Sequence, residues 1–428
     1  MTKIAGWSEL DDKAVAIARA LAMDAVQKVG NGHPGTAMSL APVAYNLFQR
    51  HLVHDPADQH WIGRDRFILS CGHSSLTLYT QLFLSGYGLE MKDLQEFRTW
   101  SSLTPGHPEF GHTAGVEMTT GPLGQGVATA VGMAMAARYE RGLLDPDAPA
   151  GSSVFDHSIW VICSDGDLQE GVSAEASSLA GTQQLSNLIM IYDDNRISIE
   201  GDTHITCTED IDARYLAYGW DVIVVSIKAD GDVDRENLER AMLSAIANKD
   251  KPVLIHIHTV IAWPAPNAKG TSKAHGSALG NDEISATKIL LGLNPAETFI
   301  APTEVINHAR EVKRRGSEMY AQWLTKFQAW EKTNNQSAEL LKRLLSKKLP
   351  ANFQDSFPAF SSEKEISTRA ASGKVIQMIA KTLPEFWGGS ADLAESNNTT
   401  IEGSASFLPA ASQMANADPY GRVIHFGI

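Results

Sequence analysis

The chain has 428 residues, 43% of them hydrophobic, and a formal net charge of −14 at pH 7. At roughly 150 residues per domain this length indicates more than one domain, and the apolar share excludes a disordered protein. The excess of acidic over basic residues argues against nucleic acids and anionic membranes as partners. The chain has three cysteines, and no apolar run approaches the about 18 residues of a membrane span. We therefore expect a cytoplasmic protein without a disulfide framework.

Helical periodicity begins close to the start of the chain. Ser8 and Asp11 match a capping box, and apolar residues then recur at helical spacing until Gly30, which predicts one helix followed by the loop NGHPG. Between residues 158 and 260, short apolar runs alternate with helical stretches at 170–180 and 235–247. The apolar runs are SIWVIC, NLIMIY, DVIVVS and PVLIHIH. This alternation predicts an α/β fold with a parallel sheet flanked by helices.

The second half of the chain has a different character. Residues 259–281 form a long, aperiodic loop rich in Pro and Gly, which favours a functional loop over a plain connector. Helical, charged sequence follows up to residue 348, and a second unit begins near Ile366 with a helix predicted at 369–383. The final VIHFGI predicts a buried strand. We expect this strand to be unpaired and the second unit poorly folded, because the sequence pattern predicts that the chain stops inside a domain.

Polar residues directly follow two of the predicted strands, at the edge where parallel sheets bind ligands. Asp165 of SDGDLQEG offers a carboxylate, Asn195 of DDNRIS an amide oxygen, and Ile197 a backbone carbonyl. These oxygen ligands suit Mg²⁺ when diphosphate oxygens complete its shell. Each motif taken singly is also what an ordinary turn contains, so both interpretations stay open.

Two further features have the composition of a binding site. GPLGQG at 121–126 precedes a helix predicted at 127–138, where glycines let backbone N–H groups reach a phosphate, although a tight turn explains the same residues. Four loop histidines stand beside proline or glycine, and a histidine held in this way can donate to substrate hydroxyls or move protons. One such residue would be an ordinary exposed histidine, whereas four indicate a site. They are His33, His73, His107 and His275.

The residues alone leave five other polar side chains ambiguous. Glu170 and Glu175 have the pattern of solvated helix acids, and Arg369 is either a surface charge or a phosphate clamp. Asp392 and Ser396 in GGSADLAESN allow a site role and a surface role in the same way.

Taken together and in chain order, the sequence motifs resemble those of the transketolase family of thiamine diphosphate enzymes over essentially the whole chain. The motifs that carry the resemblance are NGHPG, DRFILSCGHSSLTLY, TPGHPEFGHTAGVEMTTGPLGQG, SDGDLQEG, DDNRISIEG, PAPNAKGTSKAHGSALG and GGSADLAESN. The resemblance implies a diphosphate-binding domain at 1–320, a linker at 321–360 and a partial pyrimidine-binding domain at 361–428.

The resemblance also implies roles for matching residues. Mg²⁺, or another divalent ion such as Ca²⁺, would be held by Asp165, Asn195 and Ile197. Thiamine diphosphate would contact His73, Gly121, Leu123, Gly166, Asn195, His275 and Asp392. The sugar phosphate would contact His33, His107, His275, Arg369 and Ser396, and catalytic roles would fall to His33, His107, His275 and Glu170. Glu170 and Glu175 match acids that connect the two sites of the family's homodimer.

The family's reaction would move a two-carbon ketol unit from a ketose phosphate to an aldose phosphate in the pentose phosphate pathway. Ser164 and Cys71 depart from the glycine and asparagine usual in the family, and the activating glutamate has no counterpart before Ile428. One alternative is therefore a truncated or split chain that binds cofactor but needs a complementary C-terminal polypeptide for activity. Another is a related thiamine enzyme, such as dihydroxyacetone synthase or a deoxyxylulose-phosphate synthase.

Overall fold

The computed structural model describes residues 6–351 and 353–428 and divides into two compact units. The first unit contains Met1–Ala134 and His157–Gln322, and the second contains Met135–Asp156 and Trp323–Ile428. In the described parts of the chain, no helix has the length and apolar character needed to cross a bilayer.

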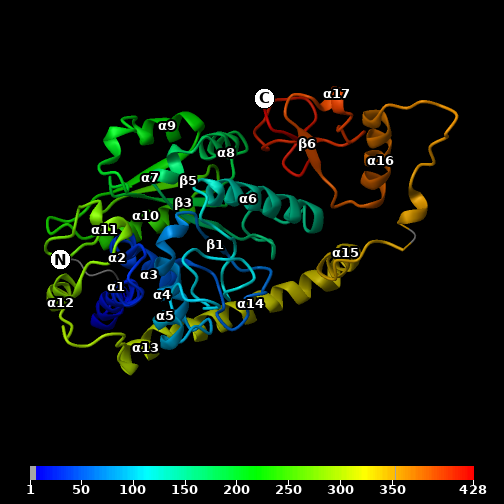
Figure 1. Ribbon diagram of the computed structural model, residues 1–428. Helices are drawn as coiled ribbons and strands as arrows, with labels where there is room; N and C mark the ends of the chain where they lie inside the picture. The colour runs from blue at the N-terminus through cyan, green and yellow to red at the C-terminus, as the bar shows by residue number, and fades with distance from the viewer. Residues whose placement is uncertain (1–5, 352) are drawn as a thin grey trace. The chain divides into compact units, whose positions relative to one another are not determined.

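A parallel five-stranded sheet forms the centre of the first unit, with strand order β1-β2-β3-β5-β4 (Figure 1). Its strands are β1 (Arg66–Leu69), β2 (Ile159–Ser164), β3 (Leu188–Asp194), β4 (Asp221–Val225) and β5 (Val253–His258). The four apolar runs predicted as strands are confirmed, and so is the parallel α/β fold. β1 is a strand that the alternation pattern did not predict. Because all five strands run the same way, their carboxyl ends meet at one edge of the sheet.

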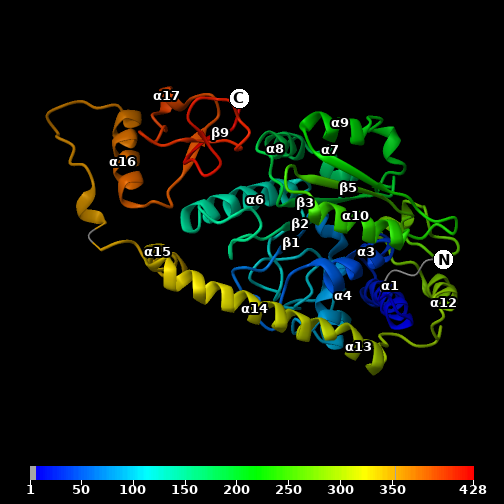
Figure 2. The same cartoon turned by 180° about the vertical axis from the view of Figure 1, so that it is seen from behind.

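Helices cover both faces of this sheet. Figures 1 and 2 show α8 and α9 on one side and α1, α3 and α4 on the other. The helices up to α13 are α1 (Glu9–Val29), α2 (Pro34–Ser39), α3 (Ala41–Asn46), α4 (Ser75–Ser85), α5 (Met91–Gln95), α6 (Gln125–Leu144), α7 (Asp165–Gln169), α8 (Gly171–Thr182), α9 (Ile211–Tyr218), α10 (Arg235–Ala247), α11 (Lys273–Gly276), α12 (Asn281–Leu290) and α13 (Thr303–Ala309). The main apolar core lies between the sheet and the side that carries α1, α4 and α10.

Helix α1 follows its sequence signals closely. The amide and hydroxyl of Ser8 donate to Asp11 at 2.6 and 2.7 Å, which forms the predicted capping box. Gly30 ends the helix in the left-handed conformation at φ 80°, which glycine adopts without steric cost. The loop that carries His33 therefore starts at a position fixed by local sequence.

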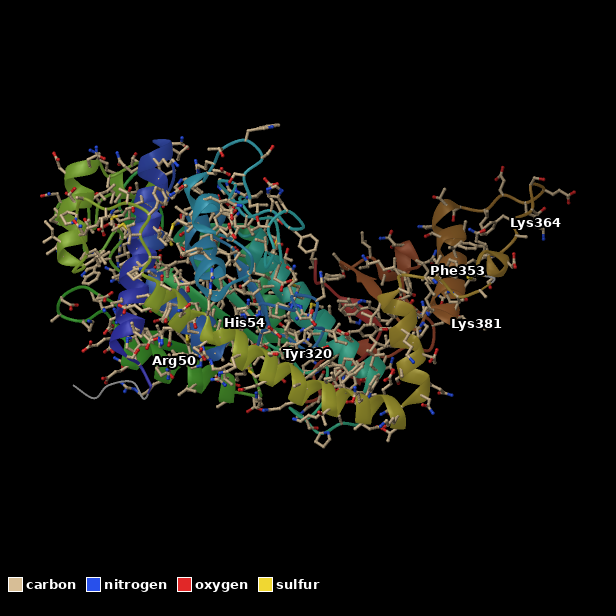
Figure 3. The ribbon with its side chains drawn as sticks, turned by 90° about the horizontal axis from the view of Figure 1, so that it is seen from below. Arg50, His54, Tyr320, Phe353, Lys364 and Lys381 are labelled. Atoms are coloured by element: carbon tan, nitrogen blue, oxygen red, sulfur yellow. The ribbon has the colours of Figure 1, made fainter. Side chains whose placement is uncertain are left out.

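Helix α14 (Glu311–Thr333) packs its first turns against the segment that follows α3. Arg315 donates to the carbonyl oxygen of Gln49 at 2.6 Å, and the rings of Trp61 and Tyr320 meet edge to face at 5.6 Å. Figure 3 shows Tyr320 on this helix and His54 beside it. The predicted helical character of the charged stretch up to residue 348 is confirmed by α12, α13, α14 and α15 (Asn335–Leu345).

The second unit contains a small parallel sheet of order β6-β9-β7-β8. Its elements are α16 (Thr368–Thr382), β6 (Gly388–Ser390), α17 (Ala394–Asn397), β7 (Ser406–Phe407), β8 (Ala417–Asp418) and β9 (Val423–His425). The expectation of an unpaired final strand is wrong, because β9 pairs with both β6 and β7 and buries Val423. Only part of VIHFGI is buried, since Phe426 and Ile428 are exposed.

A buried ion pair joins α1 to the start of α10 in the first unit. The Arg19 guanidinium lies 2.6 Å from the Asp232 carboxylate, and the two side chains are only 2% and 3% exposed. Arg19 also donates to the carbonyl oxygen of Met38 at 2.9 Å and lies over the ring of Trp263. This cation therefore connects α1 with α2 and with the loop after β5.

Replacing Asp232 should strongly destabilise the fold. Asp232→Asn removes the carboxylate that pairs with Arg19 and, at 3.2 Å, with Arg235, and breaking a buried pair in this way costs about 3–5 kcal/mol. Glu304→Gln is the matched control, because it breaks the Lys13–Glu304 pair, whose side chains are 55% and 62% exposed, and should cost about 1 kcal/mol or less. Urea unfolding of the parent and both variants measures the loss of unfolding free energy. Equal losses in the two variants would contradict the structural role given to the Arg19–Asp232 pair.

Candidate functional site

The carboxylate of Asp167 anchors three segments at the carboxyl edge of the large sheet. It accepts hydrogen bonds from the Ser70 hydroxyl at 2.6 Å, the Gly124 amide at 2.9 Å and the Ser164 amide at 3.0 Å. Ser70 follows β1, Ser164 ends β2, and Gly124 lies in the loop before α6. Asp167 has no exposed surface, so a single buried acceptor holds these loops together.

The GPLGQG loop is a tight turn whose amides already have protein acceptors in part. Besides Gly124, the Gln125 amide donates to the Pro122 carbonyl at 3.4 Å, and directly after the motif the Val127 amide donates to the Ser70 hydroxyl at 3.2 Å. The Gly124 and Gln125 amides are therefore used within the protein and not for a phosphate. The tight-turn interpretation explains this second part of GPLGQG. Gly121 adopts φ 153° beside the His107 ring.

Gly166 packs against Leu123 so closely that a Cβ atom at this glycine would lie 2.9 Å from the leucine side chain. Two residues predicted from different motifs, one after β2 and one before α6, are therefore in contact. Ser164 stands where the resembled family usually has a glycine. Here it is the N-cap residue of α7.

Asp165 presents a buried oxygen without a partner among the described residues. Its Oδ1 accepts a hydrogen bond from the Tyr192 hydroxyl at 2.7 Å, whereas its Oδ2 has none. Burial raises the pKa of Asp165 to about 6; the Tyr192 bond opposes this and the charge of Asp194 adds to it. An acceptor that is buried, acidic and unpaired fits a cation at this position.

Asn195 and Ile197 lie in the turn after the neighbouring strand β3. Asn195 donates through Nδ2 to Asp193 at 2.8 Å and accepts the Ile197 amide on Oδ1 at 2.9 Å, which leaves Oδ1 a second lone pair. Asp193 has no exposed surface, also accepts the Thr259 hydroxyl at 2.6 Å, and has its pKa raised to about 7 by burial. The network fixes the Asn195 amide in one orientation.

The four loop histidines predicted as a site do come together. Ring centroids lie 5.2 Å apart for His33 and His73, 6.5 Å for His33 and His107, and 5.4 Å for His33 and His275. His73 and His275 stack at 4.9 Å. These residues come from four segments up to 242 positions apart in the sequence.

All four imidazoles are shifted toward the neutral form. Burial, together with the charges of His275, Arg98 and His107, lowers the pKa of His33 to about 4. Burial likewise lowers the pKa of His73 well below its usual value and lowers those of His107 and His275. At neutral pH each ring thus has one donor nitrogen and one acceptor nitrogen.

Arg98 is a site residue that the sequence did not reveal. Its guanidinium lies 3.2 Å from Nδ1 of His33 and also donates to the Asn31 side chain at 3.0 Å. Since arginine only donates, His33 accepts through Nδ1 and carries its proton on Nε2. No motif marks Arg98, and its positive φ of 60° is the only local peculiarity.

Glu170 and Glu175 are both exposed at the start of α8 and within it, as the solvated-helix interpretation predicts.

In the second unit, Asp392 and Ser396 line one hollow of about 430 Å³ with His425. Arg369 is exposed in the first turn of α16 and does not line this hollow. The second unit therefore brings two of its three predicted residues together.

Acid should destabilise the histidine cluster. Because the pKa of His33 in the fold is about 4 and that of a free histidine about 6.5, the unfolded chain takes up the proton first. The contribution of His33 to stability is therefore complete above pH 6.5 and is lost as the pH falls toward 4. We expect the melting temperature to drop less between pH 7 and pH 5 in His33→Gln than in the parent.

The control is His60→Gln, which removes an exposed imidazole outside the cluster and should leave the pH dependence of the parent unchanged. Differential scanning fluorimetry at the two pH values gives the comparison. A His33→Gln variant that loses as much stability as the parent would refute the protonation argument.

Comparison with known families agrees with this geometry. Residues 10–350 match the family model "Transketolase, thiamine diphosphate binding domain", and residues 364–428 match "Transketolase, pyrimidine binding domain". The second match begins at the end of the 321–360 segment.

Curated relatives and solved structures give the same family. The chain is 56% identical to the transketolase of Mycobacterium tuberculosis and 44% identical to that of Geobacillus stearothermophilus, over 99% and 98% of its length. The crystal structure of the Pichia stipitis transketolase in complex with sedoheptulose 7-phosphate superimposes with a TM-score of 0.92 at 40% identity, covering 98% of this chain and 61% of that one. The chain spans 60% and 61% of the two curated relatives. It belongs to the transketolase family, of which it contains the thiamine diphosphate-binding domain and part of the pyrimidine-binding domain.

Proposed function

We propose that the protein acts as a transketolase, transferring a two-carbon ketol unit from a ketose phosphate to an aldose phosphate in the pentose phosphate pathway. The observation that carries the proposal is the cluster of four neutral histidines in the same unit as the unpaired Asp165 oxygen. A sugar has many hydroxyls, and neutral imidazoles can both donate to them and accept from them. Sugar phosphates are accordingly the proposed substrates.

The donor set at the sheet edge fits a hard divalent cation. Asp165 Oδ2 lacks a partner, and together with Asn195 Oδ1 and the Ile197 carbonyl it would hold Mg²⁺, or Ca²⁺ in its place. Thiamine diphosphate, when bound, supplies the nucleophilic carbon and the electron sink of the reaction. Its proposed protein contacts are His73, Gly121, Leu123, Gly166, Asn195, His275 and Asp392.

The histidines would bind and orient the sugar. His33 keeps its proton on Nε2 because Arg98 donates to Nδ1, so this ring donates to a substrate hydroxyl. His107 and His275 would polarise substrate oxygens and move protons between them. Because the cluster stays neutral at physiological pH, its rings can both donate and accept protons.

The remaining roles rest on the family resemblance. Arg369 and Ser396 would hold the substrate phosphate, and the exposed Glu170 and Glu175 would meet a second subunit in a homodimer, with Glu170 also serving catalysis across that interface. We also propose a cytoplasmic location, because three cysteines in a chain of this length suit a reducing compartment.

Cofactor binding should require both the metal and the Asp165 charge. Asp165→Asn keeps an acceptor for Tyr192 and removes the charge, so the fold should persist while thiamine diphosphate affinity in Mg²⁺ falls about tenfold or more. Isothermal titration calorimetry with the natural protein that carries this sequence measures the affinity.

Glu200→Gln is the matched control, because this exposed carboxylate lies in the same loop as Ile197. It should bind cofactor as the parent does. If Asp165→Asn binds as tightly as the parent, both with Mg²⁺ and with a chelator, the metal assignment is wrong.

The proposed reaction can be tested by measuring which donor and acceptor substrates the protein uses. With xylulose 5-phosphate as donor and ribose 5-phosphate as acceptor, the natural protein should release glyceraldehyde 3-phosphate, which a coupled assay follows. His107→Gln should lower kcat/KM roughly tenfold through loss of one hydrogen bond. Efficient turnover with formaldehyde and none with ribose 5-phosphate would instead indicate a dihydroxyacetone synthase.

A further inference from the structure

A second group of metal-ligating side chains lies on the face of the sheet that α9 covers. The strand register places Tyr192 opposite His256 and Asp194 opposite His258, so these side chains alternate onto one face at the ends of β3 and β5. Among the described residues, Asp194, His256 and His258 are the one group whose ligand atoms all lie within 4.8 Å of one another.

The two imidazoles meet the same carboxylate oxygen. Oδ2 of Asp194 lies 3.2 Å from Nε2 of His256 and 2.8 Å from Nδ1 of His258. Asp194 and His256 are buried, whereas the side chain of His258 is 32% exposed. One side of the group is therefore open to solvent.

The hydrogen-bond inventory requires a proton or a metal ion between His256 and Asp194. Nδ1 of His256 lies 2.7 Å from the Asp212 carboxylate, which only accepts, so the ring places a proton there. A neutral ring then turns the lone pair of Nε2 toward the Asp194 carboxylate, which is repulsive. Either a second proton or a metal ion must occupy this contact.

Three features suit a metal ion at this place. Ligands about 2.0–2.1 Å from Zn²⁺ lie about 3.3 Å apart in a tetrahedral site. The observed 2.8 and 3.2 Å are also hydrogen-bond distances, and they need to lengthen by about half an ångström or less to admit the ion. Asp212 orients His256 as an outer carboxylate commonly orients a zinc-bound histidine. Imidazole ligands suit Zn²⁺ better than Mg²⁺.

We propose that Asp194, His256 and His258 bind a zinc ion, with Asp212 orienting His256 and the fourth position open to solvent. The ion would connect β3, β5 and α9 on the face opposite to Asp193, whose side chain meets Thr259. This site is distinct from the proposed Mg²⁺ site, because its ligands are two imidazoles and a carboxylate that Asp165 and Asn195 do not supply.

The test uses Co²⁺ as a visible probe for a zinc site. The natural protein is freed of metal and then saturated with thiamine diphosphate and Mg²⁺, so that the other candidate site is occupied. Titration should show one Co²⁺ bound with the strong visible bands of tetrahedral coordination, and one equivalent of Zn²⁺ should remove them.

Variants then locate the ion. His258→Gln changes a half-exposed ligand and should weaken Co²⁺ binding more than about a hundredfold, while Asp212→Asn should weaken it about 10–100-fold. His204→Gln is the matched control, since His204 lies 2.9 Å from Asp202 in an exposed pair, and should bind as the parent does. Melting curves without metal check that each variant folds.

Several results would overturn the proposal. Absence of tetrahedral Co²⁺ bands in the parent would mean that a proton, not a metal, joins His256 to Asp194. Equal binding by the parent and His258→Gln would place the ion elsewhere, as would loss of binding in His275→Gln alone. None of these outcomes bears on ketol transfer, which the coupled assay tests separately.

Discussion

The buried carboxylate of Asp167 is the constraint on which the candidate site depends. Three segments at the sheet edge each donate to this side chain, through Ser70, Gly124 and Ser164. Burial raises the pKa of Asp167 while these hydrogen bonds lower it. Because an unsatisfied buried acceptor is costly, loop positions that break this arrangement are disfavoured. The loop before α6 and the turn after β2 are thus placed relative to each other before any ligand binds.

The same edge gathers three acidic side chains. Asp193 is bonded to a hydroxyl and an amide, Asp194 to two imidazoles with the Arg196 guanidinium 3.7 Å away, and Asp165 keeps one oxygen without a partner among the described residues. Burial alone would favour the protonated acids, which is why the pKa values of Asp165 and Asp193 rise to about 6 and about 7. A divalent cation relieves this cost by pairing with the charged form. The sheet edge therefore carries the donors of both proposed cation sites, with hard oxygen donors at one point and imidazoles at another.

The histidine cluster has the opposite electrostatic character. Its rings are crowded at 4.9–6.5 Å from one another, and with Arg98 nearby no ring can easily take a second proton. Neutral rings can donate and accept at the same site without drawing in counterions. This arrangement suits the uncharged hydroxyl groups of the proposed sugar substrate, whereas the acidic edge suits the proposed cation.

Local sequence determined the elements of this protein, and tertiary structure decided the contacts that make the site. The capping box and Gly30 set the limits of α1, and apolar runs predicted four strands, because such signals act within a few residues. The four loop histidines could also be identified, since each stands beside proline or glycine. The Arg98 contact with His33 and the Asp194 contacts with His256 span 65 and 62 residues. No periodicity encodes such pairs, because they exist only once the strand order has brought distant chain segments to the same edge.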